Sequence, residues 1–141
     1  MELGTFGAII KFALDIETKI GNFYQTASDL TKDVELGSIF ADLVVRGQKR
    51  TKTLERVRRE NVTEMILEPI LEFNSDSYSI VTEISEGIND DNLRVLSRNI
   101  ESTLLEFYTA AATKIDFLIE AAYAFELLAE KNEETIKRFT D

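Results

Sequence analysis

The sequence predicts an all-α protein, a four-helix bundle made of two helical hairpins that one long crossover joins. Apolar residues recur at helical spacing through most of the chain, whose 141 residues are enough for a single core. One proline and six glycines are too few breaks for a β-sandwich or a barrel. A pattern in the first half recurs in the second, which indicates two similar hairpins. Residues 1–141 are therefore expected to form one domain.

The first hairpin is expected to pair helices at residues 5–30 and 34–61. The first segment carries apolar residues at i, i+3 and i+4, which gives its helix one broad apolar face. A polar stretch separates the two segments, and within it Asp33 is placed to cap the second helix. The second segment keeps the helical spacing and ends in the charged residues 56–61.

The segment at about 62–90 is expected to be a crossover, because it is long enough to run the length of a helix bundle. Pro69 and the polar loop at 74–79 interrupt the helical pattern there. The weakly patterned residues 80–88 are consistent with a short helix that ends at Gly87.

The second hairpin is expected to pair helices at residues 91–112 and 116–139. Asn89–Asp91 is typical of a helix start. The apolar spacing then continues to the C-terminus, but one helix of about fifty residues would be far longer than usual. Comparison with the first hairpin places the turn at 113–116, with Asp116 as the N-cap.

The repeated pattern is I-E-x5-F-Y-x-x-A in the first helix of each hairpin and F-x-x-L in the second. It begins at Ile16 and at Ile100, and the F-x-x-L motifs begin at Phe40 and Phe125. These motifs resemble the rubrerythrin branch of the ferritin-like superfamily, across all four expected helices. The resemblance implies a ferritin-like bundle. Members of that family hold two irons, react with peroxide or dioxygen, and are often dimers.

The resemblance also implies where a di-iron site would lie. The family takes one glutamate from each of the first and third helices and a Glu-x-x-His pair from each of the others. The matching positions in this chain, in helix order, are Glu17, Gly47 and Arg50, Glu101, and Asn132 and Thr135. Only the two glutamates are retained. The chain has no histidine or cysteine, so neither imidazole ligands nor a rubredoxin-like iron domain is available.

The iron centre is therefore interpreted as lost, and no cofactor is expected. Oxygen-only sites favour magnesium, calcium or manganese over iron redox chemistry, and an arginine repels cations. Iron or manganese at Glu17 and Glu101 is the alternative. In the favoured interpretation Arg50 forks between Glu17 and Glu101 and donates to both, with Gly47 leaving room for it. In the competing interpretation both glutamates are solvated charges on the helix surface. Independently of that choice, Tyr24 and Tyr108 are expected to pack in the core, where their hydroxyl groups have hydrogen-bond partners.

Composition limits the partners. The balance of 26 acidic and 16 basic residues, net −10, argues against nucleic acid and anionic membranes. Seven of the 16 basic residues lie at positions 46–59, and we interpret this stretch as a surface that pairs with an acidic face of a second copy. No signal peptide or spanning segment is recognisable, so a cytoplasmic location and no membrane partner are expected.

The function expected from these observations is a non-catalytic structural or interaction module, as a homodimer with a possible protein partner. One alternative is a di-metal carboxylate protein that acts on peroxide or dioxygen, which would make it a di-iron oxidoreductase or peroxidase. Another is a small-ligand binder that uses the vacated metal cavity. Acid–base chemistry by Glu17 and Glu101 is formally open, but nothing in the sequence indicates a substrate.

Overall fold

A computed structural model describes residues 1–64 and 69–139. The described part is all-helical, with four long helices, two single 3₁₀ turns and no β-strand. This confirms the predicted all-α class and the four helices. In chain order the elements are α1 (Phe6–Leu30), α2 (Val34–Glu60), η1 (Val62–Glu64), η2 (Ser75–Tyr78), α3 (Asp90–Lys114) and α4 (Ile119–Lys137).

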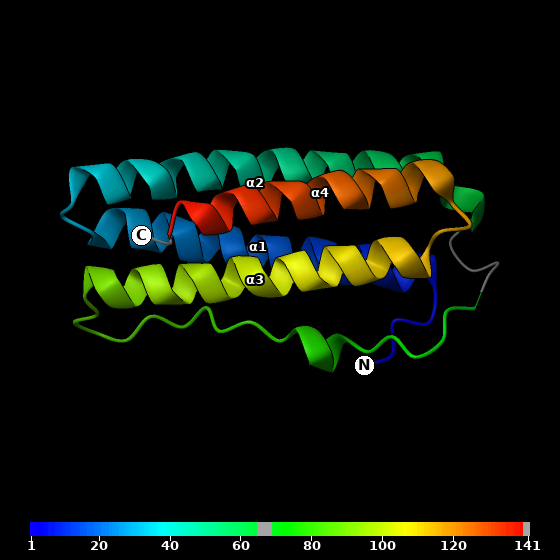
Figure 1. Cartoon of the computed structure of the whole chain (residues 1–141), viewed down its shortest axis with the longest axis horizontal. Coiled ribbons are helices and arrows are strands. Elements are labelled where there is room, and N and C mark those ends of the chain that lie inside the picture. The colour runs from blue at the N-terminus through cyan, green and yellow to red at the C-terminus, as the bar shows by residue number, and fades with distance from the viewer. Residues whose placement is uncertain (65–68, 140–141) are drawn as a thin grey trace.

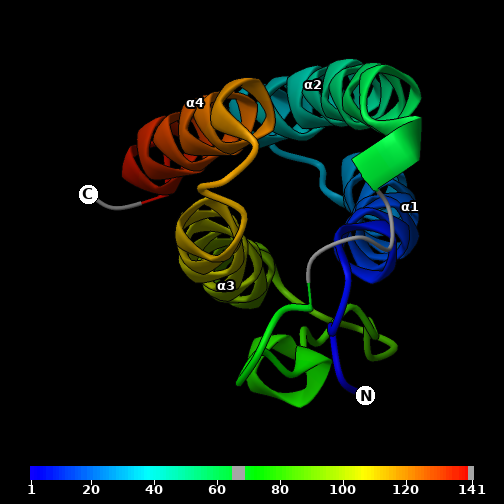
Figure 2. The ribbon, with the colours of Figure 1, turned by 90° about the vertical axis from the view of Figure 1, so that its right-hand side faces the viewer.

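The four helices form two antiparallel hairpins that lie side by side. In Figure 1 α1 and α2 run in opposite directions, as do α3 and α4, and the segment after α2 returns along the whole bundle before α3 begins. Seen end-on, α1 faces α3 and α2 faces α4 (Figure 2). Residues 65–68 of the predicted crossover lie outside the described residues.

Side-chain caps explain where three of the helices begin. Thr5, Asp33 and Asn89 each accept a hydrogen bond from the backbone amide three residues ahead, at 3.1, 3.1 and 2.8 Å. The predicted cap at Asp33 and the predicted helix start at Asn89–Asp91 are thus present. Each cap satisfies one of the amides that the first turn of a helix leaves without a partner.

The predicted start of the fourth helix at Asp116 is wrong. The helix α3 continues to Lys114, and α4 begins only at Ile119, after an N-cap residue, Leu118, that makes no side-chain hydrogen bond. Ile115 is fully buried between the helices, and the amide of Leu118 donates to its carbonyl at 2.8 Å. The chain therefore inserts an apolar side chain into the core before it turns, which moves the helix start beyond the position that the repeat predicts.

The crossover covers the side of the bundle formed by α1 and α3. The ring of Phe73 stacks on that of Phe107 with centroids 5.9 Å apart, and Tyr78 and Phe12 meet the same ring edge-on at 5.5 and 5.1 Å. The described part of the crossover does not cover the opposite side, between α2 and α4 (Figure 2).

The short helix expected at residues 80–88 is absent. The stretch is irregular, with a turn at residues 86–87 where Gly87 has a φ of 78°, in the left-handed region that glycine adopts without strain. The single 3₁₀ turn of this region lies earlier, within the predicted polar loop. Ile80, Ile84 and Ile88 are partly buried against the core, so this segment buries its apolar side chains without forming a helix.

Candidate functional site

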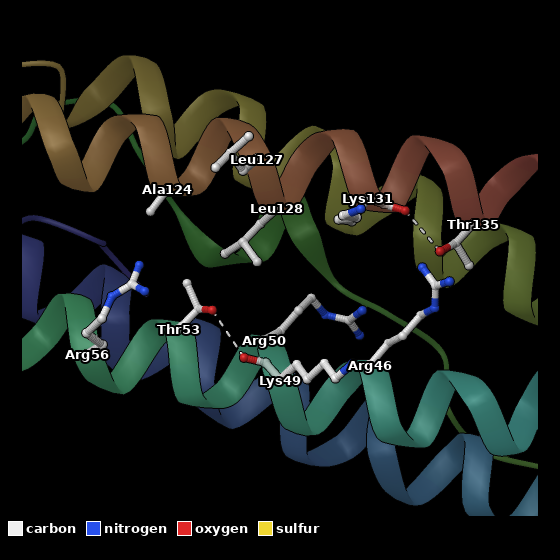
Figure 3. A pocket seen from close by; sticks show the side chains of 10 residues that line it. All are labelled: Arg46, Lys49, Arg50, Thr53, Arg56, Ala124, Leu127, Leu128, Lys131 and Thr135. Carbon is white, nitrogen blue, oxygen red and sulfur yellow. Dashed lines mark hydrogen bonds between the residues drawn. The ribbon is translucent and has the colours of Figure 1, made fainter.

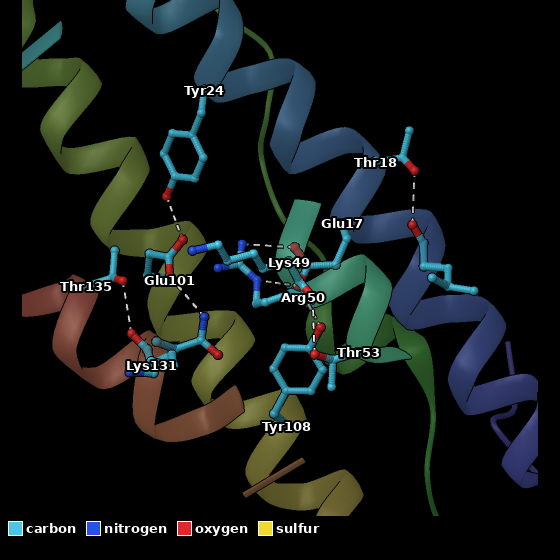
Figure 4. Close-up of polar contacts among 12 residues, drawn as sticks. Glu17, Thr18, Tyr24, Lys49, Arg50, Thr53, Glu101, Tyr108, Lys131 and Thr135 are labelled. Carbon is cyan, nitrogen blue, oxygen red and sulfur yellow. Dashed lines mark hydrogen bonds and ion pairs between the residues drawn. The ribbon is translucent and has the colours of Figure 1, made fainter. Parts of the chain in front are cut away.

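All six positions that the resemblance assigns to metal ligands are buried in the centre of the bundle. They come from all four helices: Glu17, Gly47 and Arg50, Glu101, and Asn132 and Thr135. The interpretation of the two glutamates as solvated charges is therefore wrong, because Glu17 is 3% exposed and Glu101 is fully buried. Most of these side chains meet in one polar cluster (Figure 4).

Glu17 is held by an arginine and a tyrosine. The Nε and Nη2 atoms of Arg50 donate to its two carboxylate oxygens at 2.7 and 3.0 Å, which is the two-pronged geometry that a guanidinium favours. The hydroxyl of Tyr108 donates to the same carboxylate at 2.7 Å. The side chains of Arg50 and Glu17 are 6% and 0% exposed, so this ion pair is an interior one.

Glu101 is held by neutral groups. The hydroxyl of Tyr24 donates to one of its oxygens at 2.7 Å, and the Nδ2 amide of Asn132 donates to the other at 2.9 Å. The predicted fork of Arg50 between both glutamates is therefore only half correct. Arg50 gives its hydrogen bonds to Glu17, through Nε and Nη2. Its positive charge still acts on Glu101 through space.

Each tyrosine of the repeat forms a hydrogen bond with the glutamate of the other hairpin. Tyr24 of α1 binds the glutamate of α3, and Tyr108 of α3 binds the glutamate of α1. Glutamate and tyrosine are seven residues apart in each repeat, so both lie on one helix face, two turns apart. Because α1 and α3 are antiparallel, each tyrosine lies opposite the other helix's glutamate. Sequence analysis predicted hydroxyl partners for both tyrosines but not this crossed pairing.

Two of the six positions stand apart from the carboxylates. Thr135 donates its hydroxyl to the carbonyl of Lys131, one turn back on its own helix, at 2.9 Å. Gly47 lies beside the arginine. A Cβ atom at this position would be 3.6 Å from Nη2 of Arg50, an ordinary van der Waals contact. The missing side chain is therefore not required to admit the guanidinium, contrary to the expectation from the sequence.

Substituting Gly47→Ala is accordingly expected to raise the free energy of unfolding by about 0.5–1 kcal/mol, because alanine loses less backbone entropy in a helix. Thermal and urea unfolding of the two proteins would measure the difference. A loss of stability would instead mean that the guanidinium needs the space which the methyl group takes.

Burial sets the charge states of this cluster. It raises the pKa of the Glu101 carboxyl above its usual value, and the charge of Arg50 with the two donated hydrogen bonds only partly opposes this. Burial and the neighbouring glutamates also raise the pKa of Tyr24 and of Tyr108, so both hydroxyls keep their protons. Burial alone would lower the pKa of the Arg50 guanidinium, but the contact with Glu17 raises it, and the arginine stays charged.

These residues do not fit a di-iron centre. Bridging metals would need free carboxylate oxygens and nitrogen ligands, but both oxygens of Glu17 and both of Glu101 already accept hydrogen bonds. Within residues 1–64 and 69–139 no three histidine, cysteine, aspartate or glutamate side chains are grouped to hold a metal ion. A buried guanidinium, that of Arg50, lies at the position that the resemblance assigns to a histidine.

One buried polar atom of the cluster has no partner. The Oδ1 atom of Asn132 accepts no hydrogen bond, although the residue is fully buried. A buried acceptor without a donor costs about 1–3 kcal/mol, so this atom marks the least satisfied point of the site.

Comparisons of the chain with protein-family models, with curated proteins and with solved structures gave no match. Among the described helices, none is both long and apolar enough to span a membrane.

Proposed function

We propose that the protein is a non-catalytic ferritin-like bundle with a vacated di-iron site, and that it acts as a structural or interaction module. One observation carries this proposal: the bidentate, buried ion pair between Arg50 and Glu17 lies where the resemblance would place metal ligands. In this proposal the guanidinium of Arg50 takes the place of a metal cation, and the protein's own side chains satisfy the charge of Glu17. The paired antiparallel hairpins with their long crossover support the ferritin-like part of the proposal.

The proposal includes a homodimer. Its support is a pair of large apolar side chains one turn apart that remain exposed on α4, Ile119 at 79% and Tyr123 at 60%. A second copy would remove such surface from water, which is the main driving force of association.

Metal binding before and after the missing ligands are restored tests the proposal. The wild-type protein, incubated without oxygen with Fe²⁺ or Mn²⁺ and then desalted, is expected to retain far less than one metal ion per chain. A variant that carries Gly47→Glu, Arg50→His, Asn132→Glu and Thr135→His is expected to retain about two, because these changes rebuild the ligand set. Metal content would be measured by mass spectrometry.

The matched control adds Glu17→Ala and Glu101→Ala to the rebuilt variant, which should abolish its metal binding. Stoichiometric metal in the wild-type protein, together with a peroxide-dependent change in absorbance, would instead favour the di-metal oxidoreductase. A folded rebuilt variant that binds no metal would contradict the alignment with the family on which the ferritin-like assignment depends.

A further inference from the structure

A cleft of about 530 Å³ lies between α2 and α4, on the side of the bundle that the described part of the crossover leaves uncovered. Five of its lining side chains are cationic: Arg46, Lys49, Arg50, Arg56 and Lys131. Figure 3 shows four of them along α2, with Lys131 facing them from α4. The volume is within the range of small-molecule sites, about 300–1,000 Å³.

The lining of this cleft is positively charged, whereas the chain as a whole carries a net negative charge. The protein carries 26 acidic and 16 basic residues, yet no acidic side chain lines the cleft. Four lining cations have acidic neighbours that do not line it: Glu17 at 2.7 Å from Arg50, Asp42 at 2.8 Å from Arg46, Glu60 at 3.5 Å from Arg56, and Glu134 at 3.6 Å from Lys131. These pairs neutralise only part of the positive charge.

Among the described lining residues, Lys49 carries the positive charge that has the fewest partners. Lys49 is exposed and forms no ion pair among the described residues. Arg50 is held rigidly from inside by Glu17 through Nε and Nη2, and none of the hydrogen bonds found in the described part uses its Nη1 atom. The charge of Arg50 is already shared by Glu17 and Glu101, so Lys49 is the lining cation that an external anion would meet.

The α4 wall of the cleft is apolar. Ala124, Leu127 and Leu128 line it, and Leu127 remains 41% exposed despite its size. A bare inorganic anion would leave this surface in water. A molecule with a charged group and an apolar body would satisfy both walls at once, with the charge near Lys49 and Lys131.

We propose that the α2–α4 cleft binds a small organic anion, one that carries a phosphate, sulfonate or carboxylate group on an aromatic or aliphatic body. The inference does not depend on the loss of a metal site, although Arg50 and Thr135 contribute to both places. The mixed lining, cationic along α2 and apolar along α4, favours such a molecule over a bare anion.

Two dyes that differ by one group provide the test. The anion 1-anilinonaphthalene-8-sulfonate is expected to bind saturably at one site per chain, followed by its fluorescence, and to be displaced by inorganic pyrophosphate. The neutral parent compound, N-phenyl-1-naphthylamine, has the same rings without the sulfonate and is expected to bind at least about tenfold more weakly.

Paired variants locate the binding. Lys49→Gln with Lys131→Gln is expected to weaken binding of the anionic dye about tenfold. The control, Lys52→Gln with Arg59→Gln, also removes two positive charges, but from exposed positions of α2 that do not line the cleft. It should change the affinity less than about twofold. Circular dichroism and thermal melts would establish that both variants remain folded.

Three results would overturn the proposal. Equal affinity for the two dyes would show that charge has no part in recognition, and equal losses in the two paired variants would show only general attraction. The third result is failure of both dyes to bind while the Lys49 and Lys131 variant shifts the sedimentation of the protein. That result would make the cleft a contact between proteins.

Discussion

Replacing Arg50 with methionine is expected to lower the free energy of unfolding by about 3–5 kcal/mol at neutral pH, the usual cost of removing one partner of a buried ion pair. Methionine fills similar volume, so the loss comes mainly from the carboxylate of Glu17, which remains buried without its cation. Tyr108 would still donate one hydrogen bond to it. One neutral donor cannot compensate a full charge in an interior of low polarity.

A double-mutant cycle completes the test. Glu17→Gln in the Arg50→Met background removes the orphaned charge and should recover most of the lost stability, because replacing both partners of a buried pair is often nearly neutral. Arg58→Met serves as the matched control, since Arg58 lies on the same helix but is exposed. Its expected effect is below about 0.5 kcal/mol. No recovery in the double variant would contradict the electrostatic account.

The sequence contains the information for the helices and for which residues lie inside. The helical spacing predicts four helices close to their observed bounds, and the position of Glu17 and Glu101 on apolar faces predicts their burial. The start of α4 could not be predicted in this way. It depends on how deeply Ile115 packs between the helices, which is a tertiary property that local sequence does not encode.

The partners of the two glutamates were predictable only in part. Arg50 could be inferred because a charge of opposite sign must enter the interior. The role of Asn132 and the crossed pairing of the tyrosines depend on the antiparallel alignment of α1 with α3, and on the rotation of α4 about its axis. Such relations between helices are fixed by packing and are not visible in the spacing along one chain.

The two repeats differ at one position that sets the charge of the core. Arg50 in the first hairpin corresponds to Thr135 in the second, ten residues after the phenylalanine of each F-x-x-L motif. Two interior carboxyl groups therefore share one interior cation. Both hydrogen bonds that the guanidinium donates to a carboxylate go to Glu17, so the negative charge of Glu101 is less well compensated. Burial therefore raises the pKa of Glu101.

Substituting Glu101→Gln is accordingly expected to raise the free energy of unfolding by about 1–3 kcal/mol at neutral pH and above. The amide imitates the protonated carboxyl. Its oxygen can accept from Tyr24, and its NH₂ can donate to Oδ1 of Asn132, which has no donor in the wild-type protein, once that side-chain amide turns. The substitution therefore removes a buried charge, while the unsatisfied atom of Asn132 becomes its Nδ2 donor in place of its Oδ1 acceptor.

The sign of the pH dependence follows from the raised pKa of Glu101. The folded protein binds the proton of the Glu101 carboxyl more tightly than the unfolded chain does. The stability that it contributes is present below the usual carboxyl pKa and is lost as pH rises through the raised value. Urea unfolding across this range should show a decline in wild type that is absent from Glu101→Gln, while Glu106→Gln, at an exposed position of the same helix, keeps the decline. A Glu101→Gln protein less stable than wild type at every pH would mean that the charge of Arg50 stabilises an ionised Glu101, and that the single guanidinium serves both glutamates.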